Sequence, residues 1–515
     1  MAKESRVRKS LLNARVNVIF YMMTLAVSFF SRKTFLDMLG ADFMGFTGTI
    51  GNLLGFLNIA EMGIVSAIGF VLYKPLFEGD RQTITEIISV LGHIYRIVGL
   101  VILGGGLVFG CLLPVIYPDT GFSWGVIYFA YFSFLASSLL TYFTNYRQTL
   151  LTADQRNYVV AAYSQTAYIV KTLLQIWLAY RFANYYVWLA MELVSGILYS
   201  IYLNYKINKV YPWLHSDKSE GRRLLKKYPE IMRKARQLLI HKIGAFVQSQ
   251  TSSLIIYLFV SLKVVAYYNN YTIIVSKLMI LVNNLLGSTN AGVGNLIAEG
   301  DRKNIIRVFW ELQGLQFFVA GTLSFGLVQL SDSFITLWLG REYVLSMTVT
   351  MLIVVSMFIG ITRNAVEQFL FGHGLFADVW APVAESLVCL TVAIVGGSLW
   401  GLPGVLLGSA TSLLLIVVIW KPYYLYRSGF KLPYRLYVFG YLKHLAAVIV
   451  PGVALHYLLA LGAFAPSASF WHWTGYALLN VVSYSVITFL LMYAVCPAMR
   501  TLVKRFPLGR FFRRR

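Results

Sequence analysis

Long apolar segments separated by short basic stretches dominate this sequence of 515 residues. Hydrophobic residues make up 58% of the chain and charged residues only 13%, whereas a soluble protein carries roughly 25% charged residues. A helix needs about 20 apolar residues to cross a bilayer, and a spanning segment must satisfy its own backbone hydrogen bonds. The pattern therefore predicts an all-α polytopic membrane protein.

Apolar segments of this length predict about 14 transmembrane helices. Most of the 44 Lys and Arg residues fall in the N-terminus, in alternate loops and in the C-terminal tail. Because cytoplasmic segments are enriched in Lys and Arg, this bias predicts that both termini are cytoplasmic. The predicted spans are 15–38, 45–73, 90–114, 122–145, 158–181, 183–205, 237–260, 266–297, 304–330, 345–371, 379–399, 402–421, 437–461 and 473–495.

The signature Glu-Gly-Asp-Arg occurs twice, at 78–81 and 299–302, after the second and the eighth predicted helix. A parallel repeat of six spans would place it there. The basic segment 206–236 also divides the chain after six helices, and it predicts either an amphipathic piece on an anionic membrane surface or a solvated linker. The expected parts are an N-terminal lobe at 1–205, this linker, a C-terminal lobe at 237–421, helices 13 and 14 at 422–496, and a basic tail at 497–515.

Several functional classes are disfavoured. The formal net charge is +23, but the basic residues lie between apolar spans, so membrane topology explains them better than a nucleic-acid partner. Cys111, Cys389 and Cys496 form no CxxC motif, which indicates neither a disulfide framework nor a metal site. No GxxxxGK[ST] motif occurs, so ATP is not expected to supply the energy. The predicted outer loops are short, which argues against an enzyme that holds a large substrate outside the membrane.

Charged and polar residues within the predicted spans are the candidate site. Ionisable groups in a bilayer are costly, so they are expected to face a cavity or a partner. A cavity lined with cations would suit a polyanionic substrate, above all a diphosphate. The cationic candidates are Arg32, Lys171, Lys277 and Arg363. Glu61 and Glu367 are the candidates for ion coupling, and Asn284 is a candidate polar residue of the cavity.

Each candidate also has an ordinary structural explanation. Arg363 and Glu367 are four residues apart and would pair on one helix. Lys171 and Lys277 would be neutralised by Glu61, Glu192 or Glu385 on neighbouring helices. Arg32 would extend its charged group to the outer membrane interface. Asn283, Asn284 and Asn290 would form hydrogen bonds between helices.

A set of short motifs resembles the multidrug/oligosaccharidyl-lipid/polysaccharide flippase superfamily, which includes the MATE-like transporters. The chain is most similar to the bacterial polysaccharide flippases of the O-antigen type. The matching residues are Ser31-Arg32, Leu39-Gly40-Ala41-Asp42-Phe43-Met44-Gly45-Phe46, Ala60-Glu61-Met62-Gly63-Ile64, Glu78-Gly79-Asp80 and Glu299-Gly300-Asp301.

This resemblance implies two six-helix lobes in a V, two extra C-terminal helices and alternating access. It implies a multi-pass protein of the bacterial inner membrane that moves undecaprenyl-diphosphate-linked oligosaccharides outward for surface polysaccharide synthesis. Related flippases carry cavity arginines on helices 1, 2 and 8, and Arg32 and Lys277 match the first and the last of these positions. Glu61 on helix 2 departs from the pattern.

The expected activity is transport and not catalysis, driven by an ion gradient or the membrane potential without a cofactor. The implied partners are the lipid-linked oligosaccharide, anionic lipids, a polysaccharide polymerase and a chain-length regulator. A cation-coupled exporter of drugs or metabolites with the same fold is the alternative. A carboxylate-rich cavity would favour that exporter, and a cationic cavity would favour the flippase.

Overall fold

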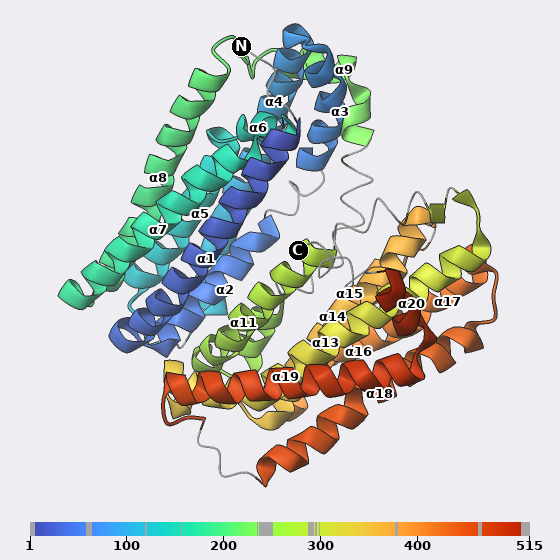
Figure 1. Ribbon diagram of the computed structural model, residues 1–515. Helices are drawn as coiled ribbons and strands as arrows, with labels where there is room; N and C mark the ends of the chain where they lie inside the picture. The colour runs from blue at the N-terminus through green and yellow to red at the C-terminus, as the bar shows by residue number, and fades with distance from the viewer. Residues whose placement is uncertain are drawn as a thin grey trace, which may run out of the picture. The chain divides into compact units, whose positions relative to one another are not determined.

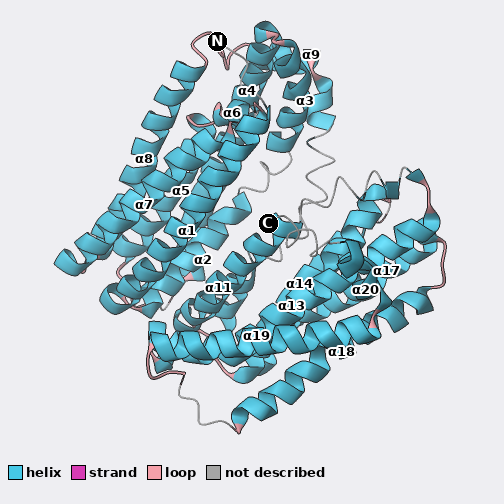
Figure 2. Cartoon of the chain, viewed as in Figure 1, coloured by secondary structure: helices cyan, strands magenta, loops and turns pink. Residues whose placement is uncertain are grey.

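The computed structural model is built from helices, and no strand occurs in the parts of the chain that it describes (Figures 1 and 2). Nine helices among these residues are long and apolar enough to cross a membrane. The prediction of an all-α polytopic membrane protein is therefore confirmed. The described residues are 6–57, 64–118, 121–154, 156–233, 235, 251–286, 293, 296–297, 299–375, 378, 380–461 and 466–505.

The chain forms two compact units, each with its own contacts. The first contains Met1–Tyr257 and Ser261–Ala266, and the second contains Leu258–Val260 and Tyr267–Arg515. The basic segment 206–236 therefore belongs to the first unit. The first unit has the helices α1 (Arg6–Leu39), α2 (Ala41–Leu57), α3 (Ile64–Glu78), α4 (Arg81–Ile116), α5 (Trp124–Phe143), α6 (Gln148–Ala153), α7 (Asn157–Phe182), α8 (Tyr185–Val210) and α9 (Gly221–Lys227).

The second unit contains most of α11 (Leu262–Leu286). Its remaining helices are α13 (Arg302–Trp338), η3 (Arg341–Tyr343), α14 (Met347–Gly372), α15 (Trp380–Trp400), α16 (Leu402–Ser412), α17 (Lys421–Tyr424), α18 (Tyr434–Ala460), α19 (Phe470–Val495) and α20 (Pro497–Arg505). Two π-helical stretches, η4 (Leu413–Trp420) and η5 (Leu425–Phe430), make α16 and α17 parts of one continuous helix over 402–430.

The repeated Glu-Gly-Asp-Arg signature has the same geometry in both units. Gly79 and Gly300 adopt φ of +75° and +78°, a conformation that glycine tolerates best. Asp80 and Asp301 then cap the N-termini of α4 and α13 with closely similar backbone angles. Each Asp side chain accepts backbone N–H groups of the first turn, which would otherwise lack partners. The sequence repeat is thus a structural repeat of the turn that starts a long helix.

Most predicted spans coincide with observed helices, but some boundaries move. The predicted breaks near 182 and 401 are present, since α7 and α8 are separate helices and α15 ends just before α16. The single predicted helix at 45–73 is described as α2 and α3, and residues 58–63 between them lie outside the described part. The helix predicted at 402–421 continues to Phe430 through the π-helical stretches.

Part of the basic segment packs on the first unit. Gly221 starts α9 against α4, where an added Cβ would meet Ser89 O at 2.7 Å, so a larger residue would push α9 away. Lys218 Nζ donates to Phe143 O at 2.8 Å, and partial burial lowers the pKa of this lysine. Lys227 Nζ donates to Glu86 at 2.6 Å, which raises the lysine's pKa. Neither sequence alternative anticipated this docking onto α4.

The C-terminal helices belong to the second unit. The predicted helices 13 and 14 are observed as α18 and α19, and the tail begins with α20, which contacts α13 and α19. The cluster Phe317, Phe325, Val448 and Tyr484 packs α13 against these helices. Residues 506–515 of the basic tail lie outside the described residues.

Candidate functional site

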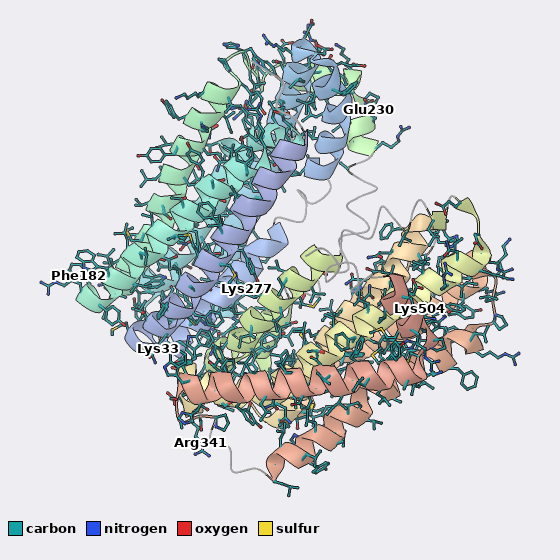
Figure 3. All side chains as sticks on the ribbon, in the orientation of Figure 1. Lys33, Phe182, Glu230, Lys277, Arg341 and Lys504 are labelled. Carbon is teal, nitrogen blue, oxygen red and sulfur yellow. The ribbon has the colours of Figure 1, made fainter. Side chains whose placement is uncertain are left out.

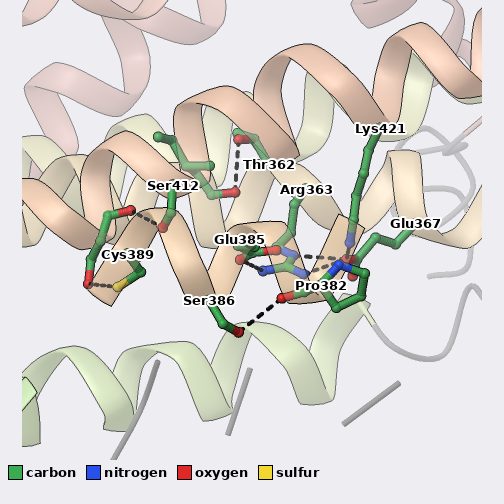
Figure 4. Close-up of polar contacts among 11 residues, drawn as sticks. Thr362, Arg363, Glu367, Pro382, Glu385, Ser386, Cys389, Ser412 and Lys421 are labelled. Carbon is green, nitrogen blue, oxygen red and sulfur yellow. Dashed lines mark hydrogen bonds and ion pairs between the residues drawn. The ribbon is translucent and has the colours of Figure 1, made fainter. Parts of the chain in front are cut away.

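Four charged side chains meet inside the second unit and form the ion cluster Arg363, Glu367, Glu385 and Lys421 (Figure 4). Arg363 and Glu367 lie one turn apart on α14. Glu385 lies on α15, and Lys421 begins α17 between the two π-helical stretches. Two cations and two carboxylates give the cluster no net formal charge.

Glu367 is the centre of the cluster. Its Oε1 accepts hydrogen bonds from Arg363 Nε at 3.0 Å and Arg363 Nη2 at 2.6 Å, and a third from Lys421 Nζ. Charge-assisted bonds of this kind are the strong ones. The predicted pairing of Arg363 with Glu367 is therefore present, and Lys421 adds a second cation from another helix.

Glu385 contacts the cluster more loosely. Arg363 Nη1 is 3.9 Å from Glu385 Oε1, and the residue is only 5% exposed. No described residue hydrogen-bonds to this buried oxygen. Sequence reasoning considered Glu385 only as a partner of Lys171 or Lys277, but the cation beside it is Arg363.

Two glutamines of α13 hold the backbone of α14 beside Arg363. Gln313 Nε2 donates to Thr362 O at 3.2 Å, and Gln316 Oε1 accepts from Ala365 N at 2.9 Å. Both side chains are almost fully buried. They fix the segment that carries Arg363, because buried amides need hydrogen-bond partners. Sequence reasoning missed them, although two glutamines three residues apart in an apolar span are a readable signal.

In the first unit, Lys171 of α7 pairs with Glu192 of α8. Lys171 Nζ is 2.7 Å from Oε1 and 2.8 Å from Oε2, and the ring of Tyr168 lies 5.1 Å from the same nitrogen. Gln175 Nε2 donates to Trp188 O at 3.0 Å beside this pair. One of the partners considered from the sequence is thus the observed one, and the charge of Lys171 is balanced locally.

Lys171 also lines a groove of about 440 Å³ between α7 and α8. Its other walls are mainly apolar and aromatic. They are formed by Ala162, Tyr163, Thr166, Ala167, Val170, Leu174, Met191, Val194, Ser195, Leu198, Tyr199 and Tyr202.

Arg32 lies near the C-terminal end of α1 and is partly buried. Its Nη2 donates to Ala266 O at 3.1 Å. The neighbouring Lys33 is exposed and faces Asp37 at 3.7 Å. Two adjacent cations therefore have different surroundings: Arg32 contacts the backbone of α11, and Lys33 is exposed near the end of α1 (Figure 3).

The remaining candidates are less fully described. Lys277 is partly buried on α11, in the second unit (Figure 3). Asn284 is a helical position of α11 whose side chain lies outside the described part, and Glu61 lies outside the described residues altogether. Among the described residues, no group of His, Cys, Asp and Glu side chains is placed to hold a metal ion. The roles predicted for these residues stay predictions.

Comparison with known proteins identifies the fold. No protein-family model matches the chain, and no curated protein matches it in sequence. The inward closed structure of the lipid II flippase MurJ is similar over 94% of this chain and 100% of its own, with a TM-score of 0.66 and 15% identity. An inward-facing MATE family multidrug resistance transporter of the MOP superfamily matches 81% of this chain and 99% of its own, with a TM-score of 0.61 and 12% identity. The chain thus has the fold of these membrane proteins, as the sequence motifs predicted.

Proposed function

We propose that this chain is a flippase that moves a polyprenyl-diphosphate-linked oligosaccharide from the cytoplasmic to the outer leaflet of a bacterial inner membrane. The observation that carries the proposal is the similarity of nearly the whole chain to a protein described as a lipid II flippase. The substrate would be a surface-polysaccharide unit of the O-antigen, capsule or exopolysaccharide type. The chain would transport it without altering it chemically, and a polymerase and a chain-length regulator would act on it afterwards.

The cationic side chains on the helices are evidence for a substrate with an anionic headgroup. Arg32, Lys171, Lys277 and Arg363 lie on the long helices α1, α7, α11 and α14. A charge within a bilayer is retained at considerable cost. A diphosphate accepts several charge-assisted hydrogen bonds, so cations of this kind would stabilise it well. The lipid tail would stay in the bilayer, and the energy would come from an ion gradient or the membrane potential.

A cation-coupled exporter of drugs or metabolites is the second candidate. It is favoured by one observation: Lys171 and Arg363 are both paired with carboxylates, which reduces the positive charge available to an anion. A MATE family multidrug transporter is also among the proteins with this fold. The two candidates differ in substrate charge, which is measurable.

The test uses proteoliposomes that contain a labelled undecaprenyl-diphosphate oligosaccharide and an impermeant reagent that modifies only the outer leaflet. Protein-dependent transfer is expected, and Lys277→Ala should abolish it while the protein still reconstitutes normally. Lys263→Ala removes an exposed cation of the same helix α11 and serves as the matched control. Equal transfer with Lys277→Ala and wild type would contradict the assigned role of Lys277. Export of organic cations without any glycolipid transfer would favour the second candidate.

A further inference from the structure

The two carboxylates of the ion cluster are held very differently. Glu367 Oε1 receives hydrogen bonds from Arg363 and Lys421, whereas Glu385 Oε1 is 3.9 Å from Arg363 and accepts none from any described residue. Glu385 is also the more buried of the two. A buried carboxylate oxygen that accepts no hydrogen bond makes the ionised form costly, and binding a proton lowers that cost. Glu385 is therefore the group of the cluster at which a proton is best accommodated.

The charged groups around Glu385 are few and come from two neighbouring elements. Arg363 and Glu367 face it from α14, and Lys421 faces it from α17. The sequences of α16 and η4, which pack against α15, contain no charged residue. On α15 itself the nearest titratable group is Cys389, whose thiol lies 3.7 Å from Ser409 Oγ. A proton on Glu385 would change the cluster from no net charge to a single positive charge.

That change would act chiefly on Arg363. With Glu385 neutral, the guanidinium of Arg363 keeps its hydrogen bonds to Glu367 but loses the attraction of the Glu385 carboxylate. Lys421 competes for the same Glu367 oxygen from a helix with π-helical geometry on both sides. Such stretches are frequent at functional sites and can change their hydrogen-bond register. Arg363, in contrast, is on a backbone held by Gln313 and Gln316.

We propose that Glu385 is the proton-binding group of this protein and that its protonation gives the ion cluster the positive charge that an anionic substrate requires. The proposal rests on the flippase function proposed above and makes H⁺ an ion that binds and moves together with the anionic substrate. Glu367, the carboxylate first considered for coupling, then has a positioning role: it stays ionised and holds the two cations.

The first test detects the proton itself and does not depend on transport. Infrared difference spectra between mildly alkaline and acidic pH should show the carbonyl band of a protonated carboxylic acid in the reconstituted wild-type protein. Glu385→Gln should remove that band, and Glu385→Asp should move it while keeping the carboxyl group if Gln is poorly tolerated. Glu342→Gln removes an exposed carboxyl of the same unit and should leave the band in place. A band that persists unchanged in both Glu385 variants, or its absence from the wild type, would overturn the proposal.

The second test asks whether the proton is used in transport. Flipping by the wild type should accelerate when the side from which the glycolipid is taken is made the more acidic, because proton and anionic substrate bind together. Glu385→Gln should lose this acceleration, and Glu342→Gln should retain it. Acceleration that survives in Glu385→Gln would remove Glu385 from the coupling step. If no variant and no wild-type sample moves the glycolipid, the flippase function fails, and the infrared result still decides whether Glu385 binds a proton.

Discussion

The first unit pairs Lys171 with one carboxylate, whereas the second unit brings two cations and two carboxylates together. The Lys171–Glu192 pair links two adjacent helices and borders an open groove. The ion cluster instead joins α14, α15 and α17, and one of its carboxylates lacks a hydrogen bond on a buried oxygen. A single pair has one favourable arrangement, but a cluster with unequal carboxylates has a place where charge can change. This difference indicates that the second unit is the better place to look for a group that changes its charge.

The turns that start α4 and α13 show the opposite behaviour, because here the two units agree. Both use a glycine with positive φ followed by an aspartate cap. The arginine after the cap has a different partner in each: Arg81 lies over the Trp213 ring at 5.5 Å, and Arg302 donates to Phe430 O and Lys431 O. The two turns therefore share a backbone conformation, but the arginine that follows each cap contacts different groups.

The largest expected effect comes from Glu367→Gln in the ion cluster. Removing this charge leaves the partly buried cations Arg363 and Lys421 beside each other, and breaking a buried ion pair from one side costs up to about 3–5 kcal/mol. The free energy of unfolding in detergent, followed by circular dichroism, should fall by about this amount. Glu342→Gln, at an exposed position of the second unit, should change it little. A small effect of Glu367→Gln would mean that the cluster does not stabilise the second unit.

A smaller effect is expected in the first unit from Lys171→Met. Glu192 would keep the weak contact of Gln175 Nε2 at 3.4 Å. Only one charge loses its partner here, whereas Glu367→Gln removes the shared partner of two cations. We expect a loss of about 1–3 kcal/mol. A double-mutant cycle with Glu192→Gln would measure the coupling directly. If the coupling energy of Lys171 and Glu192 equalled that of Glu367 and Lys421, the two units would not differ in how strongly their ion pairs stabilise them.

The turns that start α4 and α13 can be compared by how much each contributes to stability, and the expected effects are smaller again. Gly79→Ala and Gly300→Ala should each cost about 1 kcal/mol, because a side chain at positive φ is strained. An added Cβ would meet no atom within 4 Å at either position, so the cost is that of the backbone alone. Thermal unfolding of the two variants should therefore show similar decreases. Unequal decreases would show that only one turn is needed to fix its helix.

The smallest effect concerns pH. Hydrogen bonds from Thr83 hold the pKa of Asp80 below its usual range. A lowered pKa means that the stabilising effect is complete above the ordinary aspartate pKa of about 4 and is lost as the pH falls through the lowered value. Asp80→Asn keeps a capping side chain but has no charge to lose. Its melting temperature should depend less on pH in the acidic range than that of the wild type, and an identical dependence would contradict the assignment.

Much of the fold was predictable because its main determinants are local. Apolar length defines the helices, and the Glu-Gly-Asp-Arg signature encodes the same turn twice. The pairing of Arg363 with Glu367 followed from helical spacing alone. The contribution of Lys421 did not, because it depends on which helix packs against α14. The same holds for Gln313 and Gln316, whose role appears only when α13 and α14 are side by side.

The docking of α9 on α4 has a consequence for proteolysis. The basic segment is rich in the Lys and Arg residues at which trypsin cleaves, and several of them are exposed. A protease needs an extended chain, so cleavage beside Lys226 or Lys227 requires α9 to unfold locally. The rate of cleavage there would then report how often this segment leaves α4. The basic segment is thus a reporter of local opening in the first unit as well as a connection along the chain.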